Sequence, residues 1–451
     1  MRIAAFFISL LALLVFGLPF VTRGDGTVSG AVQSFMTYSL TAVSFLLALL
    51  TLFMSRSLSD ELVFRQILIL MAKPLPRWQF ILGKWVGIVG FNLALLTVSG
   101  AGIYGMVRYL AAFQPPRDEL DGQRLRGEVL TARHHAGFQV PRELFRRIAN
   151  QEFERRKEEG LYADSAGLDP EKAIAELQRM VEIGWRNIAP GEFRRFEFSN
   201  VLCDRDPDKT LQIHYKCLAS NYPPDEIIRT SWQIGNPEKV RPEVMRRRDI
   251  HDRYHTFSVR ADTVAPDGTL DIFLANTNPY LGDPEYPDET DPSYVVRVDE
   301  SAGIEVLFAA GSFEGNLLRV LLLILFKLMF LAALGLAAAS VFSFPVASLV
   351  SLTVYVLAAA RRFIADALGY LGDDGAVKVF QTVFGLALRG VLFVIPDFPA
   401  YDAVDVFVDG RNVTLMWVLD GFGVLAVVQT GILLMLACLL FHRREVSEVS
   451  I

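Results

Sequence analysis

The stretch "LLRVLLLILFKLMFLAALGLAAASVF" (residues 317–342) decides the class of this protein. A bilayer core about 30 Å thick is crossed by about 20 apolar helical residues. This stretch is longer than that, and Arg319 and Lys327 are its only charged residues. The chain as a whole is 52% hydrophobic over 451 residues, which is more apolar than an ordinary soluble protein of this length. The sequence therefore predicts a membrane protein.

Working outward from this stretch, five further apolar segments are predicted to cross the membrane, at 3–21, 35–54, 86–107, 345–368 and 421–441. The first could also be a signal peptide, but no A-x-A-like cleavage site follows it and a second apolar segment comes at once. Residues 375–398 are apolar but are interrupted by Lys378, Gln381 and Arg389, which predicts a re-entrant or interfacial segment. The expected fold is a polytopic α-helical membrane protein with six spans.

The charged residues concentrate between the third and fourth spans. Residues 114–315 hold 37 of the 50 acidic and 27 of the 44 basic residues, so a soluble, acidic domain is predicted there. Its acidity argues against a nucleic-acid partner. The expected parts are a transmembrane part (1–112), an extracytoplasmic domain (113–315) and a second transmembrane part (316–451).

Positive charges predict the orientation of the spans. Cytoplasmic loops carry an excess of Lys and Arg, and such residues gather between the second and third spans (Arg56, Arg65, Lys73, Arg77 and Lys84) and after the last one (Arg443 and Arg444). Both termini are then cytoplasmic, and residues 113–315 lie outside a bacterial inner membrane. Arg361 and Arg362 depart from this pattern, because they fall at the outer end of the fifth span.

The connection after the second span has the sequence of a rigid elbow. Ser59 can cap a helix whose first turn holds Asp60 and Glu61. Pro74 ends that helix, and Pro76 can begin the next one. Such a corner is either an ordinary positive loop or a docking element for a cytoplasmic partner.

A resemblance favours the docking element. The stretch "LSDELVFRQILILMAKPLPRWQFILGKWVG" (58–87) resembles the signature of ABC type-2 transporter permeases, the membrane subunits of type V exporters. Residues 315–347 and 395–445 are similar to the later spans of that family. The resemblance implies a coupling helix over 57–79, held by a separate ATPase. The residues it assigns to ATPase coupling are Glu61, Arg65, Lys73, Pro74, Arg77, Gly83 and Lys84.

The predicted outer domain has two parts. Residues 117–190 read as helical, most clearly at 141–160 and 169–185. From 193 to 313 the pattern changes to alternation in seven short segments, "RFEFSNV", "LQIHYKC", "RTSWQIG", "HTFSVRA", "TLDIFLA", "YVVRV" and "GIEVLFA". Short alternating segments separated by polar turns predict a β-sandwich or jelly-roll.

The sequence offers little for catalysis in this chain. A P-loop needs a Gly-rich turn before Lys and Ser/Thr, whereas Gly83-Lys84 is followed by Trp85 and opens a span. ATP and Mg²⁺ are therefore expected on a partner ATPase, and no cofactor is expected here. His251 and His255 have i,i+4 spacing but no evident third ligand, and the acidic run 282–292 lacks the spacing of a known calcium loop, so no metal site is predicted.

Two further features carry predictions about single residues. Cys203 and Cys217 lie on neighbouring predicted strands, and an oxidising compartment would permit a disulfide between them. Lys327 lies inside a span, where a charge is costly. It either snorkels to the headgroups, with Arg319 in water above it, or faces the interior and the transport pathway, where it meets an anionic substrate or a carboxylate.

The sequence thus predicts the permease subunit of an ATP-driven ABC exporter that pairs with a second permease chain and an ATPase subunit. One alternative is a mechanotransmitting subunit, in which the spans move no solute and the outer domain acts on a lipid, a lipoprotein or a periplasmic partner. A membrane scaffold or sensor without a transport role is the other.

Overall fold

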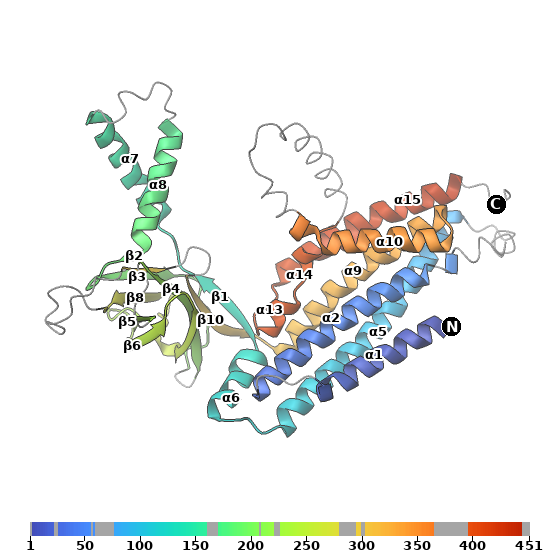
Figure 1. Ribbon diagram of the computed structural model, residues 1–451, viewed down its shortest axis with the longest axis horizontal. Helices are drawn as coiled ribbons and strands as arrows, with labels where there is room; N and C mark the ends of the chain where they lie inside the picture. The colour runs from blue at the N-terminus through green and yellow to red at the C-terminus, as the bar shows by residue number, and fades with distance from the viewer. Residues whose placement is uncertain are drawn as a thin grey trace. The chain divides into compact units, whose positions relative to one another are not determined.

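The computed structural model describes residues 2–21, 26–55, 57–58, 76–159, 170–206, 209–220, 226–278, 295–298, 303–364 and 396–443. The chain forms two compact units (Figure 1). Unit one comprises Met1–Ala132 and Gly311–Ile451, and unit two comprises Arg133–Ala310.

Unit one is helical. Its longer helices are α1 (Arg2–Val21), α2 (Val28–Met54), α5 (Arg77–Phe113), α9 (Phe313–Val341), α10 (Phe344–Ala359) and α15 (Thr430–Arg443). Shorter elements are α6 (Glu119–Arg124), η1 (Leu125–Val129), η3 (Pro399–Tyr401), α13 (Val404–Val408), α14 (Leu415–Gly421) and η4 (Phe422–Gln429). The last of these continues from α14 and leads into α15 without a break.

Four helices of the described chain are long and apolar enough to cross a membrane, at Val28–Met54, Arg77–Phe113, Phe313–Val341 and Leu415–His442. They contain the predicted spans 35–54, 86–107 and 421–441, and all of 317–342 except its last residue. The apolar helices at Ala5–Leu18 and Phe344–Ala359 are shorter. The predicted segment 375–398 lies almost entirely outside the described residues.

Helix α9 is the centre of unit one. It packs against α2, α5, α10 and α15 (Figure 1), and most of its residues are buried. The Ser312 hydroxyl accepts a hydrogen bond from the Gly315 amide and caps its start. Helices α5 and α9 approach closely at Gly100, where a Cβ would lie 2.5 Å from the Leu321 side chain.

The boundary between the units differs from the predicted one at residue 113, because Asp121 of α6 fastens residues 113–132 to unit one. Its carboxylate accepts hydrogen bonds from the Val28 amide at 2.9 Å and from the Ser29 amide and hydroxyl at 3.1 and 2.6 Å. The Arg117 amide donates a fourth at 3.0 Å. The carboxylate thus pairs free amides at the start of α2, where a negative charge is also favoured.

Replacing Asp121 with alanine is expected to lower the stability of unit one by about 2 kcal/mol, the cost of a lost helix cap. Burial alone would raise the pKa of this carboxyl, but the hydrogen bonds from Ser29, Val28 and Arg117 outweigh it and hold the pKa well below its usual range. The contribution is therefore present above about pH 4, the unfolded pKa, and is lost as the pH falls below it. Thermal unfolding of the wild type and the variant in detergent measures the difference, which should shrink in acid.

Unit two is a two-layer β-sandwich, and the strand pairs among its described residues are antiparallel. One sheet has the order β1-β10-β4-β9-β2, with β7 also paired to β4, and the other has the order β3-β8-β5-β6. The strands are β1 (Ala132–Gly137), β2 (Asn187–Ile188), β3 (Phe193–Phe198), β4 (Thr210–Ala219), β5 (Ile227–Ile234), β6 (Glu243–Ile250), β7 (Tyr254–Arg260), β8 (Leu270–Asn276), β9 (Val296–Val298) and β10 (Ile304–Gly311). All seven predicted strands are confirmed, and β1, β2 and β6 were not predicted.

The two sheets share one hydrophobic core. Trp232 of β5 is fully buried, with its ring 4.5 Å from that of Tyr215 on β4 and 5.4 Å from that of Phe257 on β7. Phe196 and Leu274 also contribute to this core. The sandwich is thus held by side chains that the alternating pattern points inward.

The predicted helices of the outer domain are confirmed as α7 (Arg142–Glu158) and α8 (Pro170–Arg186). They pack on each other through Ala149, Phe153 and Leu177. Trp185 at the end of α8 joins this helix pair to the sandwich, because its ring lies 5.3 Å from that of Phe196.

The predicted disulfide between Cys203 and Cys217 is wrong, since both are free thiols. Cys203 lies before β4, whereas Cys217 is seven residues into that strand, opposite Val298. Seven strand residues span about 23 Å, and a disulfide needs Cα atoms within about 7 Å. The residues on either side of Cys203 bond elsewhere: the Val201 amide donates to the Gly268 carbonyl, and Arg205 donates to the Val264 carbonyl.

Candidate functional site

The residues that follow the predicted elbow are hydrogen-bonded to the last helix. Helix α5 begins at Arg77, after Pro76. The Arg77 guanidinium donates to the His442 carbonyl at 2.8 Å and to the Phe441 carbonyl at 3.4 Å. Cations are favoured at the C-terminal end of a helix, where carbonyls lack partners. Arg77 therefore ties the start of α5 to the end of α15.

The first flank of the elbow meets α5 at the same end of unit one. The Lys84 ammonium donates to the Ser57 hydroxyl at 3.3 Å and lies 5.3 Å from the centre of the Phe80 ring. A Cβ on Gly83 would meet no atom within 4 Å, so packing in this chain does not require that glycine. The other residues assigned to coupling, Glu61, Arg65, Lys73 and Pro74, lie outside the described residues.

One hydrogen bond connects the beginning of α5 to the middle of α9. The Trp85 indole N–H donates to the Met329 carbonyl at 3.1 Å. This contact lies two residues from Lys327, the charged residue inside α9. A shift of α5 would thus act on α9 close to Lys327.

Lys327 is paired with a carboxylate. Its residue is 8% exposed, and its ammonium lies 3.6 Å from Oδ2 of Asp402. It sits about 21 Å along α9 from Phe313. The ammonium of Lys327 therefore has a counter-charge within unit one.

Residues 396–403 form a polar turn around this pair. Asp397 lies 3.9 Å from the Arg361 guanidinium, and the Tyr401 hydroxyl donates to Asp420 at 2.8 Å. Phe398 is buried, with its ring 5.8 Å from that of Phe330 on α9. The turn thus brings carboxylates to the helix surface that carries Lys327.

Arg319 has its own partners at the beginning of α9. Its guanidinium donates to the Asn412 side chain at 2.6 Å and to the Val413 carbonyl at 2.9 Å. Asn316 donates to the Arg411 carbonyl and accepts from the Val413 amide, both at 2.8 Å. These bonds fix the start of α9 to the segment before α14, so Arg319 has a structural role.

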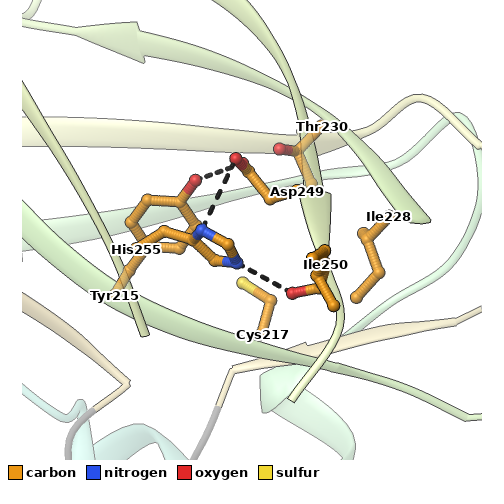
Figure 2. A pocket seen from close by; sticks show the side chains of 7 residues that line it. All are labelled: Tyr215, Cys217, Ile228, Thr230, Asp249, Ile250 and His255. Carbon is orange, nitrogen blue, oxygen red and sulfur yellow. Dashed lines mark hydrogen bonds and ion pairs between the residues drawn. The ribbon is translucent and has the colours of Figure 1, made fainter. Parts of the chain in front are cut away.

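In unit two, a charged network joins the two sheets (Figure 2). The Tyr215 hydroxyl donates to the Asp249 carboxylate, and Arg247 donates to that carboxylate at 2.8 and 3.0 Å. Burial and the hydrogen bond to Asp249 raise the pKa of Tyr215 far above its usual range. The adjoining cavity, of about 10 Å³, has room for one water and no larger ligand.

Of the two candidate histidines, His255 belongs to the protein's own hydrogen-bond network. His255 is bonded to the Ile250 carbonyl at 2.8 Å and lies 3.8 Å from Asp249 (Figure 2). In the described part of the chain, no group of three or more His, Cys, Asp and Glu side chains could hold a metal ion.

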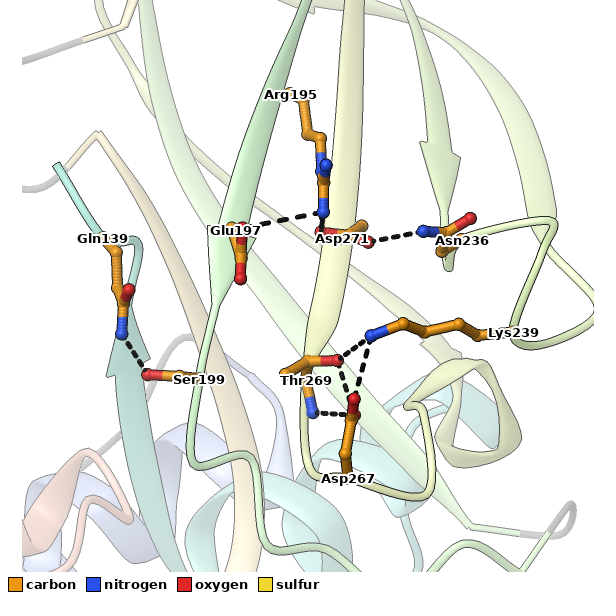
Figure 3. A network of polar contacts seen from close by, with 9 residues as sticks. All are labelled: Gln139, Arg195, Glu197, Ser199, Asn236, Lys239, Asp267, Thr269 and Asp271. Carbon is orange, nitrogen blue, oxygen red and sulfur yellow. Dashed lines mark hydrogen bonds and ion pairs between the residues drawn. The ribbon is translucent and has the colours of Figure 1, made fainter. Parts of the chain in front are cut away.

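A second network lies on β3, β8 and the loops beside them (Figure 3). Arg195 of β3 pairs with Asp271 of β8 at 2.9 Å and lies 3.6 Å from Glu197. Lys239 pairs with Asp267 at 2.8 Å. Charges of both signs therefore neutralise each other in this part of the four-stranded sheet.

No protein-family model, curated protein or solved structure matches this chain.

Sequence reasoning missed Asp402, the partner of Lys327. It lies within residues 395–445, the stretch that resembles the last span. The available signal was chemical: a lysine within a span needs a counter-charge, and residues 397–405 hold three aspartates next to an apolar segment.

Proposed function

We propose that this chain is the membrane-spanning permease subunit of an ATP-driven exporter, coupled to a separate ATPase through the elbow at 57–79. It works with six spans, as a homodimer or with a second permease chain. Both termini are cytoplasmic, and the outer unit lies beyond a bacterial inner membrane. ATP and Mg²⁺ are bound by the ATPase.

The observation that carries this proposal is the chain of contacts that begins at the elbow. Arg77 joins α5 to α15, and Trp85 joins α5 to α9 beside Lys327. A push on the elbow would thus reach the charged pair Lys327–Asp402 through packed helices. Ionisable side chains within spans mark pathways and relays in membrane proteins, and a scaffold needs no such link.

Mechanotransmission is the second candidate function. Helix α9, which carries Lys327, follows β10 of the sandwich with Ser312 as the residue between them. A displacement of α9 would therefore pull directly on a strand of the outer unit. In this version the ATPase is the same, but the work is done on a lipid or protein outside the membrane.

The coupling assignment predicts the effect of reversing one charge in the elbow. Glu61→Lys is expected to reduce the activity that the chain restores to a deletion strain by at least about tenfold, the effect of losing about 1.4 kcal/mol of coupling. The spans are not expected to unfold, because the change lies in the elbow. The measurements are complementation, membrane expression, and ATP hydrolysis by the complex that co-purifies with tagged full-length chain.

The matched control is Glu158→Lys, the same reversal at an exposed position of α7. It should leave complementation unchanged. Normal complementation by well-expressed Glu61→Lys would refute the coupling role of the elbow. Absence of a P-loop ATPase from the purified wild-type complex would refute the permease proposal itself.

A further inference from the structure

Strand β6 forms an open edge of the four-stranded sheet. It pairs with β5 on one side over all of its eight residues, Glu243–Ile250. At the opposite end of this sheet, β3 is met by the bridge between Phe138 and Phe198. Among the described residues, no other strand is hydrogen-bonded to the outer side of β6, where the Ile250 carbonyl is bonded to the His255 side chain at 2.8 Å. An unpaired edge of this length is a template for another extended chain.

The exposed face of β6 carries two arginines between two apolar residues. Val244 and Ile250 are 62% and 39% exposed, and Arg246 and Arg248 lie exposed between them. Within the described chain, neither of these arginines makes an ion pair, unlike Arg195 on the same sheet, which has Asp271 (Figure 3). The edge thus presents two unneutralised cations flanked by apolar side chains.

The other face of β6 holds the strand in place. Arg247 and Asp249 are bonded to each other and to Tyr215 of the opposite sheet. The Arg247 guanidinium also lies 5.0 Å from the centre of the Phe257 ring, and Met245 packs against the core. A strand fixed in this way is ordered before any partner arrives, which lowers the entropic cost of binding.

We propose that β6 docks an extended acidic segment of a partner protein, which adds a strand to the sheet. Residues directly opposite each other on paired strands have Cβ atoms about 5 Å apart, and side chains on one face recur every second residue. The matching segment therefore has the pattern apolar-x-acid-x-acid-x-apolar, with its acids opposite Arg246 and Arg248. This inference goes beyond the proposed function and does not depend on it.

Charge selects this partner over a second copy of the chain. Two β6 strands paired with each other would bring arginines against arginines, and like charges across strands are destabilising. In many proteins, charged side chains on an edge strand serve only to prevent that strand from pairing with another chain. A site for β-strand addition differs from a protected edge in two ways. It binds a segment of opposite charge, and this binding needs the backbone N–H groups of that segment.

The test uses fluorescent heptapeptides and the full-length chain in detergent micelles. We expect the peptide VTETETV to bind at least about tenfold more tightly than VTKTKTV in an anisotropy titration. The double variant Arg246→Glu/Arg248→Glu should reverse that preference. Its melting temperature, measured on the same samples, shows that the sandwich is intact. An N-methylated VTETETV, which lacks alternate N–H donors, should lose binding.

Three results would overturn the proposal. If no arginine-dependent binding is seen up to about 1 mM peptide, the arginines of β6 only protect the edge strand against pairing. Equal binding of the N-methylated peptide would show charge attraction without strand addition. Arginine-dependent binding of phosphatidylglycerol vesicles by the chain in nanodiscs, with no binding of VTETETV, would assign the surface to a membrane.

Discussion

Replacing Asp402 with alanine is expected to destabilise unit one by about 3–5 kcal/mol, because it leaves the buried Lys327 ammonium without its counter-charge. Lys327→Met should cost far less, since it leaves behind a carboxylate whose side chain is 57% exposed. The double variant should recover most of the loss, because no unpaired buried charge remains. Unfolding of the four proteins in detergent measures all the terms of this cycle.

A loss in the double variant equal to the sum of the two single-variant losses would contradict the pairing. The function of the pair is read separately, from complementation by Lys327→Met. Loss of activity with normal expression and normal co-purification of the ATPase would place Lys327 on the transport pathway. Full activity would restrict the pair to a structural role.

The second large effect is expected in unit two. Trp232→Ala should destabilise the sandwich by about 3–5 kcal/mol, since it removes a fully buried ring between Tyr215 and Phe257. That is a large share of the total stability of about 5–15 kcal/mol that is typical of a domain. The measurement is the rate at which a protease cleaves within residues 133–310, with cleavage of the helical unit followed in the same samples.

Trp232→Phe is the matched control, because it keeps an aromatic ring and removes less volume. It should lie between the wild type and Trp232→Ala. Unchanged protease resistance in Trp232→Ala would contradict the described core. Because unit one is a separate compact unit, its own resistance should stay the same in both variants.

Alternation predicted seven strands because each of them buries one face and exposes the other. Strand β6 was not predicted, because its inward positions include Arg247 and Asp249. These two side chains are hydrogen-bonded to each other, and Asp249 is also bonded to Tyr215. A polar network on the core side removes the apolar period on which strand prediction depends. Among the three strands that were not predicted, β6 is the one at the end of the four-stranded sheet.

Contacts between residues far apart in the chain were not predictable in the same way. Lys327 was identified because placing a charged side chain within a span costs free energy, but its partner Asp402 lies 75 residues later. Asp121 is 93 residues from Val28, whose amide it pairs. Local patterns reveal that a charge needs compensation, whereas only the packed helices decide which residue supplies it.

Unit two begins and ends on paired strands. Its first and last residues, Arg133 and Ala310, lie in β1 and β10, which are hydrogen-bonded neighbours. Just below them, a Cβ on Gly311 would lie 3.3 Å from the Cβ of Ala132. The unit is thus an inserted domain whose two ends lie close together. A very short linker could therefore close the helical bundle after its removal, and the excised piece could be circularised or transplanted as one part.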